Sequence, residues 1–114
     1  MRKNMKIYKY DLHYHSVPEI VRLPKNTEIV DFGIQEKSFK LWALVDPEAE
    51  KEERVFVLVM TGQDIPWNVK QTFGTRVVEE SGIVVHLLEL LDVEKGTGPL
   101  SANDPQEDER LKTN

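Results

Sequence analysis

Hydrophobic residues in this chain occur in short blocks with a period of two, and turn residues separate the blocks. In residues 6–12, for example, Tyr8, Tyr10 and Leu12 fall on one face of an extended segment. A period of two is typical of strands that are buried on one face, because alternate side chains of a strand point in opposite directions. We therefore expect strands rather than helices over most of the chain.

The expected strands cover residues 6–12, 19–23, 27–35, 39–45, 54–60, 69–72 and 76–78. Polar breaks between them fit hairpins, and residues 46–53 read as the main surface loop. The last block, 83–91, is ambiguous, because Ile83, Leu87 and Leu90 also recur at helical spacing. The β-branched start of this block favours a strand.

These blocks predict an all-β fold, a small antiparallel sandwich or barrel of six to seven strands. The alternative is an α+β fold with a C-terminal helix at 83–92. We expect one β domain over residues 1–95, since a typical domain holds about 100–150 residues. The polar composition of residues 96–114 predicts a flexible, disordered, acidic tail.

Composition excludes several classes of function. The chain has 114 residues and no cysteine, so disulfides, thiolate zinc sites, iron–sulfur clusters and a cysteine nucleophile are excluded. With 15 basic and 20 acidic residues, its net charge of −5 makes nucleic acid an unlikely partner. No apolar run approaches the about 20 residues of a membrane span, and the charged start is unlike a signal peptide. We expect a cytoplasmic protein without membrane contact.

Two tryptophans are the strongest candidates for binding anchors. Trp42 lies on the second face of an expected strand, and Trp67 follows Pro66 in a loop. Aromatic side chains in such places are frequent at interfaces, although both are also suited to core filling.

Histidine provides the other candidates. His86 is either a structural residue with satisfied ring nitrogens or a catalytic base that needs a carboxylate such as Asp46 or Asp64. His13 and His15 share a face if extended and would need His86 or Asp46 to complete a metal site, so two exposed histidines in a turn are the simpler interpretation. The chain contains no phosphate-binding loop, dinucleotide fingerprint or nucleophile elbow. We predict no catalytic residues, metal or cofactor.

The chain resembles a family of small uncharacterised proteins from bacteriophages and prophages. The resemblance is carried by Lys6–Leu12, Val21–Ile29, Leu41–Pro47, Thr61-Gly62, Thr72-Phe73 and Val84–Glu89. The Leu-Trp-Ala-Leu-Val-Asp block that ends at Asp46 is its most specific part. The family tends to place a His and a Pro after Thr61-Gly62, where this chain has Gln63-Asp64-Ile65-Pro66. The resemblance implies a phage-encoded protein and no particular activity.

These observations favour a non-enzymatic phage accessory protein that binds a host or phage protein, or a small ligand, in the host cytoplasm. The expected binding residues are Trp42, Asp46, Thr61, Gly62, Trp67 and His86. Continuous apolar strands in a short chain also indicate a homo-oligomer, because both faces of a sheet must be covered. The alternatives are a virion structural protein, such as a decoration or tail-associated subunit, and a small hydrolase that uses His86 with a carboxylate.

Overall fold

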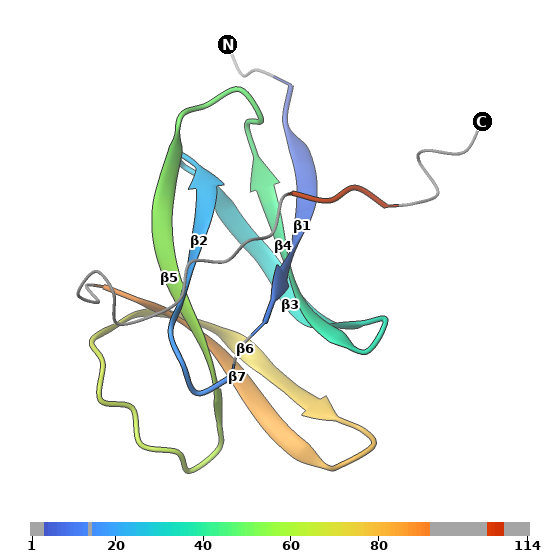
Figure 1. Cartoon of the computed structure of the whole chain (residues 1–114), viewed down its shortest axis with the longest axis vertical. Coiled ribbons are helices and arrows are strands. Elements are labelled where there is room, and N and C mark those ends of the chain that lie inside the picture. Colours follow the sequence, from blue (N-terminus) through green and yellow to red (C-terminus); the bar gives the residue numbers. More distant parts are fainter. Residues whose placement is uncertain (1–3, 14, 92–104, 109–114) are drawn as a thin grey trace.

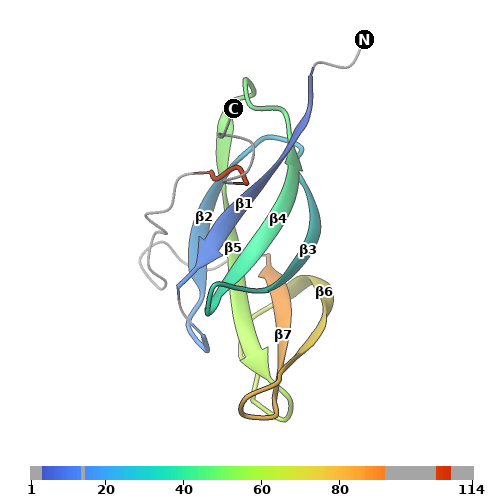
Figure 2. The same cartoon turned by 90° about the vertical axis from the view of Figure 1, so that its right-hand side faces the viewer.

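The computed structural model describes residues 4–13, 15–91 and 105–108 of the chain, and within them it is an antiparallel two-sheet structure (Figures 1 and 2). The strands in these residues are β1 (Lys6–Leu12), β2 (Glu19–Pro24), β3 (Glu28–Gln35), β4 (Ser38–Val45), β5 (Lys51–Met60), β6 (Val69–Val78) and β7 (Ile83–Leu90). One sheet has the order β1-β4-β3 and the other β2-β5-β7-β6. The prediction of an all-β antiparallel fold is confirmed.

The helix considered for residues 83–92 was a wrong alternative. β7 pairs with β5 on one side and β6 on the other, for example through Val57↔Leu88 and Arg76↔Val85. Both faces of β7 carry apolar residues because both are covered, and the resulting run also fits helical spacing.

Two strands are longer than expected. β5 begins at Lys51, since its polar start pairs with β2 through Leu23↔Glu52 and Pro24↔Lys51. β6 is one strand over residues 69–78, although we expected a break at 73–75. The irregular register between Thr72 and Thr75, with Gly74 at φ +118°, accommodates the break within the strand.

The main core lies between the two sheets. It contains Tyr10, Leu12, Val21, Leu23, Phe32, Leu41, Ala43, Val45, Phe56, Leu58, Val85 and Leu87. The two-residue period predicted the inward faces of β1 and β4, which supply Tyr10, Leu12, Leu41, Ala43 and Val45. Removal of these side chains from water is the main source of stability in such a sandwich.

A second apolar cluster lies on the opposite face of the four-stranded sheet. Val57, Val59, Leu88 and Leu90 form it, and Val55 and Trp67 pack against it. These strand residues are buried within a single chain. The argument that a second copy is needed to cover this face therefore does not hold, and the oligomeric state stays a prediction.

Candidate functional site

His86 lies on β7 between two threonine hydroxyls. Its Nε2 is hydrogen-bonded to Oγ1 of Thr61 at 2.8 Å, and its Nδ1 to Oγ1 of Thr75 at 2.9 Å. Thr61 follows β5 and Thr75 lies on β6, so the strands on both sides of β7 position the ring. Both ring nitrogens thus have a polar partner, which is the arrangement expected of a structural histidine. Sequence reasoning missed Thr75, because the register of β6 and β7 is needed to find it.

Two other expected binding residues lie in the connection between β5 and β6. Gly62 forms the turn after β5 with φ +89°, a left-handed conformation that glycine adopts at low cost. Trp67 is half-buried and packs against the second apolar cluster, which includes Val59, the cross-strand neighbour of His86. The structure therefore brings Thr61, Gly62 and His86 together where β5 ends, and Trp67 packs against the second apolar cluster of the same sheet.

Trp42 and Asp46 belong to the other sheet. Trp42 is half-buried on the outer face of β4, close to Gly33 of β3. Asp46 follows β4, and its carboxylate accepts a hydrogen bond from the backbone N–H of Glu48 at 3.0 Å. This contact stabilises the turn that leads to β5. The six predicted binding residues thus do not form one site.

The two N-terminal histidines lie beyond the end of β1, so the shared strand face that we considered for them is not formed. The backbone N–H of His13 donates to Glu19 at 2.9 Å, and the His13 ring lies 3.1 Å from the same carboxylate. Within residues 4–13, 15–91 and 105–108 there is no group of three or more His, Asp or Glu residues suited to a metal ion.

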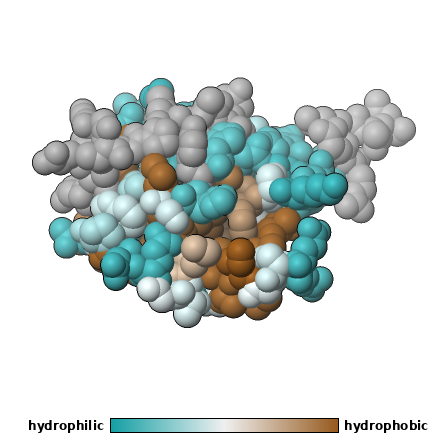
Figure 3. Space-filling model, turned by 60° about the horizontal axis from the view of Figure 1, so that its bottom comes forward, coloured by the Kyte–Doolittle hydropathy of each residue, from teal (hydrophilic) through white to brown (hydrophobic). Residues whose placement is uncertain are grey.

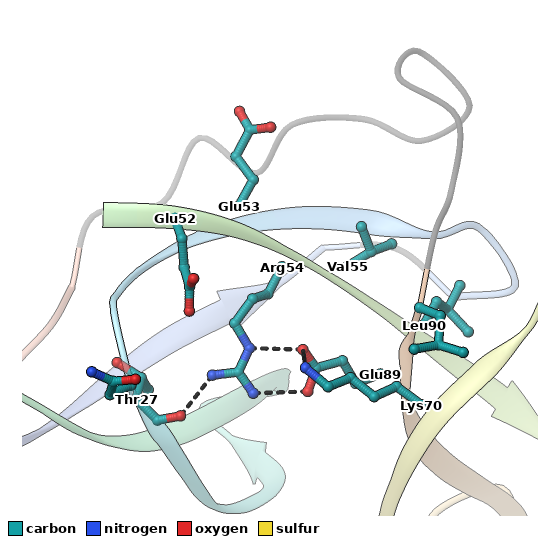
Figure 4. Close-up of a pocket in the computed structure, with 10 residues that line it drawn as sticks. Thr27, Glu52, Glu53, Arg54, Val55, Lys70, Glu89 and Leu90 are labelled. Carbon is teal, nitrogen blue, oxygen red and sulfur yellow. Dashed lines mark hydrogen bonds and ion pairs between the residues drawn. The ribbon is translucent and has the colours of Figure 1, made fainter. Parts of the chain in front are cut away.

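A pocket of about 390 Å³ lies where Arg54 of β5 meets Glu89 of β7 (Figure 4). Arg54 donates from Nε and Nη2 to the two oxygens of Glu89, both at 2.7 Å. Its Nη1 donates to the carbonyl oxygen of Thr27 at 2.6 Å, so the guanidinium joins the four-stranded sheet to the start of β3. Glu89 is only 2% exposed. A buried carboxylate needs such a bidentate partner, because its desolvation is otherwise costly.

The rim of this pocket carries further charges. Lys70 Nζ lies 3.9 Å from the Glu89 carboxylate, and Glu52 points toward the pocket while Glu53 points away from it (Figure 4). We did not predict this pair from the sequence. The available signal was that Glu89 shares a strand face with Leu87, a position where an unpaired carboxylate is unfavourable. Arg54 and Glu89 satisfy each other's hydrogen-bonding groups, so we interpret the pair in this pocket as structural.

A larger hollow, of about 480 Å³, lies at the other end of the sandwich. It is lined by Ile34, Lys37, Arg76, Val77, Val78, Glu79 and Glu80. Val78 pairs with Ile83, and both side chains point to the same face of the sheet as the core residue Val85. The β6–β7 hairpin therefore extends this apolar face beyond the buried core. Figure 3 shows apolar surface gathered at this end between hydrophilic side chains.

Exposure and charge distinguish this hollow from the Arg54 pocket. Ile34 is 45% exposed and Ile83 44%, whereas Val77, 58% exposed, faces the opposite side of β6 with Thr75. The guanidinium carbon of Arg76 lies 5.0 Å from the centre of the Phe32 ring, and Arg76 also pairs with Asp31. The arginine is thereby held over the Phe32 ring beside the hollow. Exposed aliphatic residues around a held arginine are typical of protein-binding surfaces.

The chain was compared with family models, curated proteins and solved structures. No curated protein and no solved structure matches it. No helix long and apolar enough to cross a membrane is found in the part of the chain that the structure describes. A family model described as a domain of unknown function, DUF7352, matches residues 3–97. This match covers all seven strands, and the chain therefore belongs to the DUF7352 family.

Proposed function

We propose that this protein is a non-enzymatic binding module. It holds a partner protein at the end of the sandwich where the β6–β7 hairpin and the hollow beside Arg76 lie. The observation that carries the proposal is the hollow beside Arg76, in which Ile34 is left exposed next to the inward-facing Val78. An apolar side chain of a partner would remove these residues from water. Lys37 in the β3–β4 turn, and Arg76, Glu79 and Glu80 in the β6–β7 hairpin, supply charges that orient it.

The hydrolase alternative has less support from the geometry. The ring nitrogens of His86 are hydrogen-bonded to two threonine hydroxyls, and not to the carboxylate that the hydrolase interpretation pairs with it. The phage context rests on the resemblance of the sequence to phage and prophage proteins. We therefore place the proposed partner, a host or phage protein, in the cytoplasm of an infected cell, with a role in the virion as the alternative.

The test compares capture of proteins from infected-cell lysate by three full-length variants. We expect the wild type to enrich one protein, and Ile34→Asp to weaken its binding at least about tenfold, because a charge would be buried in the interface. Val30→Asp is the matched control, since Val30 is similarly exposed, at 51%, but lies outside the hollow. Equal capture by Ile34→Asp and the wild type, or no enriched protein at all, would contradict the proposal.

A further inference from the structure

In the C-terminal residues 105–108, Gln106 forms an isolated antiparallel bridge with Lys9 of β1. The backbone N–H of Lys9 donates to the carbonyl oxygen of Gln106, and the N–H of Gln106 donates to the carbonyl oxygen of Lys9, both at 2.9 Å. We call residues 105–108 the tail segment. It occupies one position, Lys9, on the outer edge of the three-stranded sheet, of which β1 is the last strand.

Side chains give this pairing a chemical preference. Lys6 Nζ lies 3.5 Å from Glu107 Oε1, and Gln106 Nε2 donates to Asp11 Oδ2 at 3.1 Å. Burial raises the pKa of the Asp11 carboxyl, but hydrogen bonds from Lys40 and Gln106 and the charge of Lys40 lower it below 3.8 overall. The Asp11 carboxyl is therefore an ionised acceptor. A basic residue and a carboxylate on β1 thus meet an acidic residue and an amide on the tail segment.

The edge of β1 offers more hydrogen bonds than the tail segment uses. In an antiparallel sheet, alternate residues of a strand bond to one neighbouring strand and then to the other. Because Lys9 bonds to the tail segment, the backbone groups of Ile7 and Asp11 point toward the same outer edge. Among the described residues, the pairing on this edge is a single bridge at Lys9.

The contact of the tail segment is easily displaced. Its backbone hydrogen bonds replace bonds to water, and its ion pair is exposed, so each contributes little net stability. Open strand edges invite pairing with another chain, and many proteins recognise extended peptides in this way. A longer strand would bond to Ile7, Lys9 and Asp11 together, with about six backbone hydrogen bonds.

We propose that the outer edge of β1 is a strand-addition site for an extended acidic segment of a partner protein, and that the tail segment covers this site until the partner displaces it. The tail segment is joined to Leu91 through residues 92–104, thirteen positions. This tether gives it a high effective concentration, so the same short segment of a second copy competes poorly. A partner segment prevails by pairing over a greater length of β1.

The experiment uses the full-length chain and a fluorescent peptide with the sequence of residues 103–110, Asn-Asp-Pro-Gln-Glu-Asp-Glu-Arg. Gln106→Pro removes the N–H that donates to Lys9, and it should detach the tail segment. We expect this variant to bind the peptide at least about tenfold more tightly than the wild type, because its site is open. Amide exchange at Lys9 should be faster in the variant and slow again when the peptide is added.

Gln106→Ala is the matched control, since it keeps the backbone pairing and should bind the peptide much more weakly than Gln106→Pro does. The proposal is overturned if Gln106→Pro binds the peptide no more tightly than the wild type. It is also overturned if light scattering shows that Gln106→Pro forms dimers in which amide exchange at Lys9 is slow without peptide, because the occupant is then a second copy. The hollow beside Arg76 is unchanged in these variants, so failure of this proposal leaves the proposed function standing.

Discussion

Tyr10 illustrates how the core alters the chemistry of a single residue. The side chain lies between the two sheets and is only 1% exposed. Burial, with a smaller contribution from the charge of Tyr8, raises the pKa of its phenol from 10.0 to about 12. The neutral phenol is favoured because a phenolate in this place would lose its hydration.

This pKa predicts a loss of stability at high pH. Below pH 10 the phenol is neutral in both states. Between pH 10 and about 12 the unfolded chain releases the Tyr10 proton while the folded chain keeps it, so folding becomes less favourable as pH rises. We expect the free energy of unfolding to fall by about 1 kcal/mol from this residue by pH 11. Urea unfolding of the wild type and Tyr10→Phe from pH 8 to 11 measures it, and equal pH slopes would refute it.

At the scale of elements, alternation in the sequence predicted strands well and their irregularities poorly. β4 has the inward face that its alternation predicts. β3 does not, because its register shifts between Ile29 and Asp31. Val30 is consequently exposed, while Ile29 and Phe32 both contact the core, although alternation placed Val30 with Phe32. Such a bulge is stabilised by contacts between elements that a local pattern does not contain.

Two glycines, one in β6 and one in β3, provide a test of the irregular register of β6 between Thr72 and Thr75. Gly74 in β6 has φ +118°, a conformation that L side chains rarely adopt, so Gly74→Ala should cost more than about 1 kcal/mol. Gly33 in β3 is the matched control, because a Cβ there would meet its neighbours at 3.9 Å, an ordinary contact. We expect Gly33→Ala to be neutral or slightly stabilising. Thermal unfolding compares the two, and equal shifts in Tm would contradict the strain at Gly74.

The candidate sites show the same limit of sequence reasoning. His86 was identified from its residue type and Thr61 as part of the Thr61-Gly62 pair that carries the resemblance, and the structure places them in contact. The Arg54–Glu89 pair was missed, because its members lie 35 positions apart and only the register of β5 against β7 brings them together. Residue type thus indicates which groups need a partner, whereas strand order decides which partner they meet.

At the scale of the whole molecule, the two ends of the sandwich are built differently. At one end Arg54 binds Glu89 and the Thr27 carbonyl, and so connects the two sheets through a buried charge. At the other end Arg76 lies over Phe32, and the β6–β7 hairpin carries Ile83 past the core into solvent. A satisfied polar cluster favours a structural role for the first end. Exposed apolar residues favour binding at the second.

This difference predicts that the Arg54–Glu89 pair acts on stability and not on partner binding. Arg54→Met leaves Glu89 buried without its bidentate partner, so it should cost about 3–5 kcal/mol. The double variant Arg54→Met/Glu89→Leu removes both charges and should lie within about 2 kcal/mol of the wild type, since no buried charge is left unpaired. Chemical denaturation of the single and double variants measures these costs.

Lys70→Ala is the control for this cycle, because the Lys70 side chain is half exposed and lies 3.9 Å from Glu89. An exposed cation at that distance should contribute less than about 1 kcal/mol. A cost for Arg54→Met as small as that of Lys70→Ala would mean that water or Lys70 satisfies Glu89 in place of the arginine. The Arg54 end would then resemble an open ligand site, and the assignment of structure to one end and binding to the other would have to be abandoned.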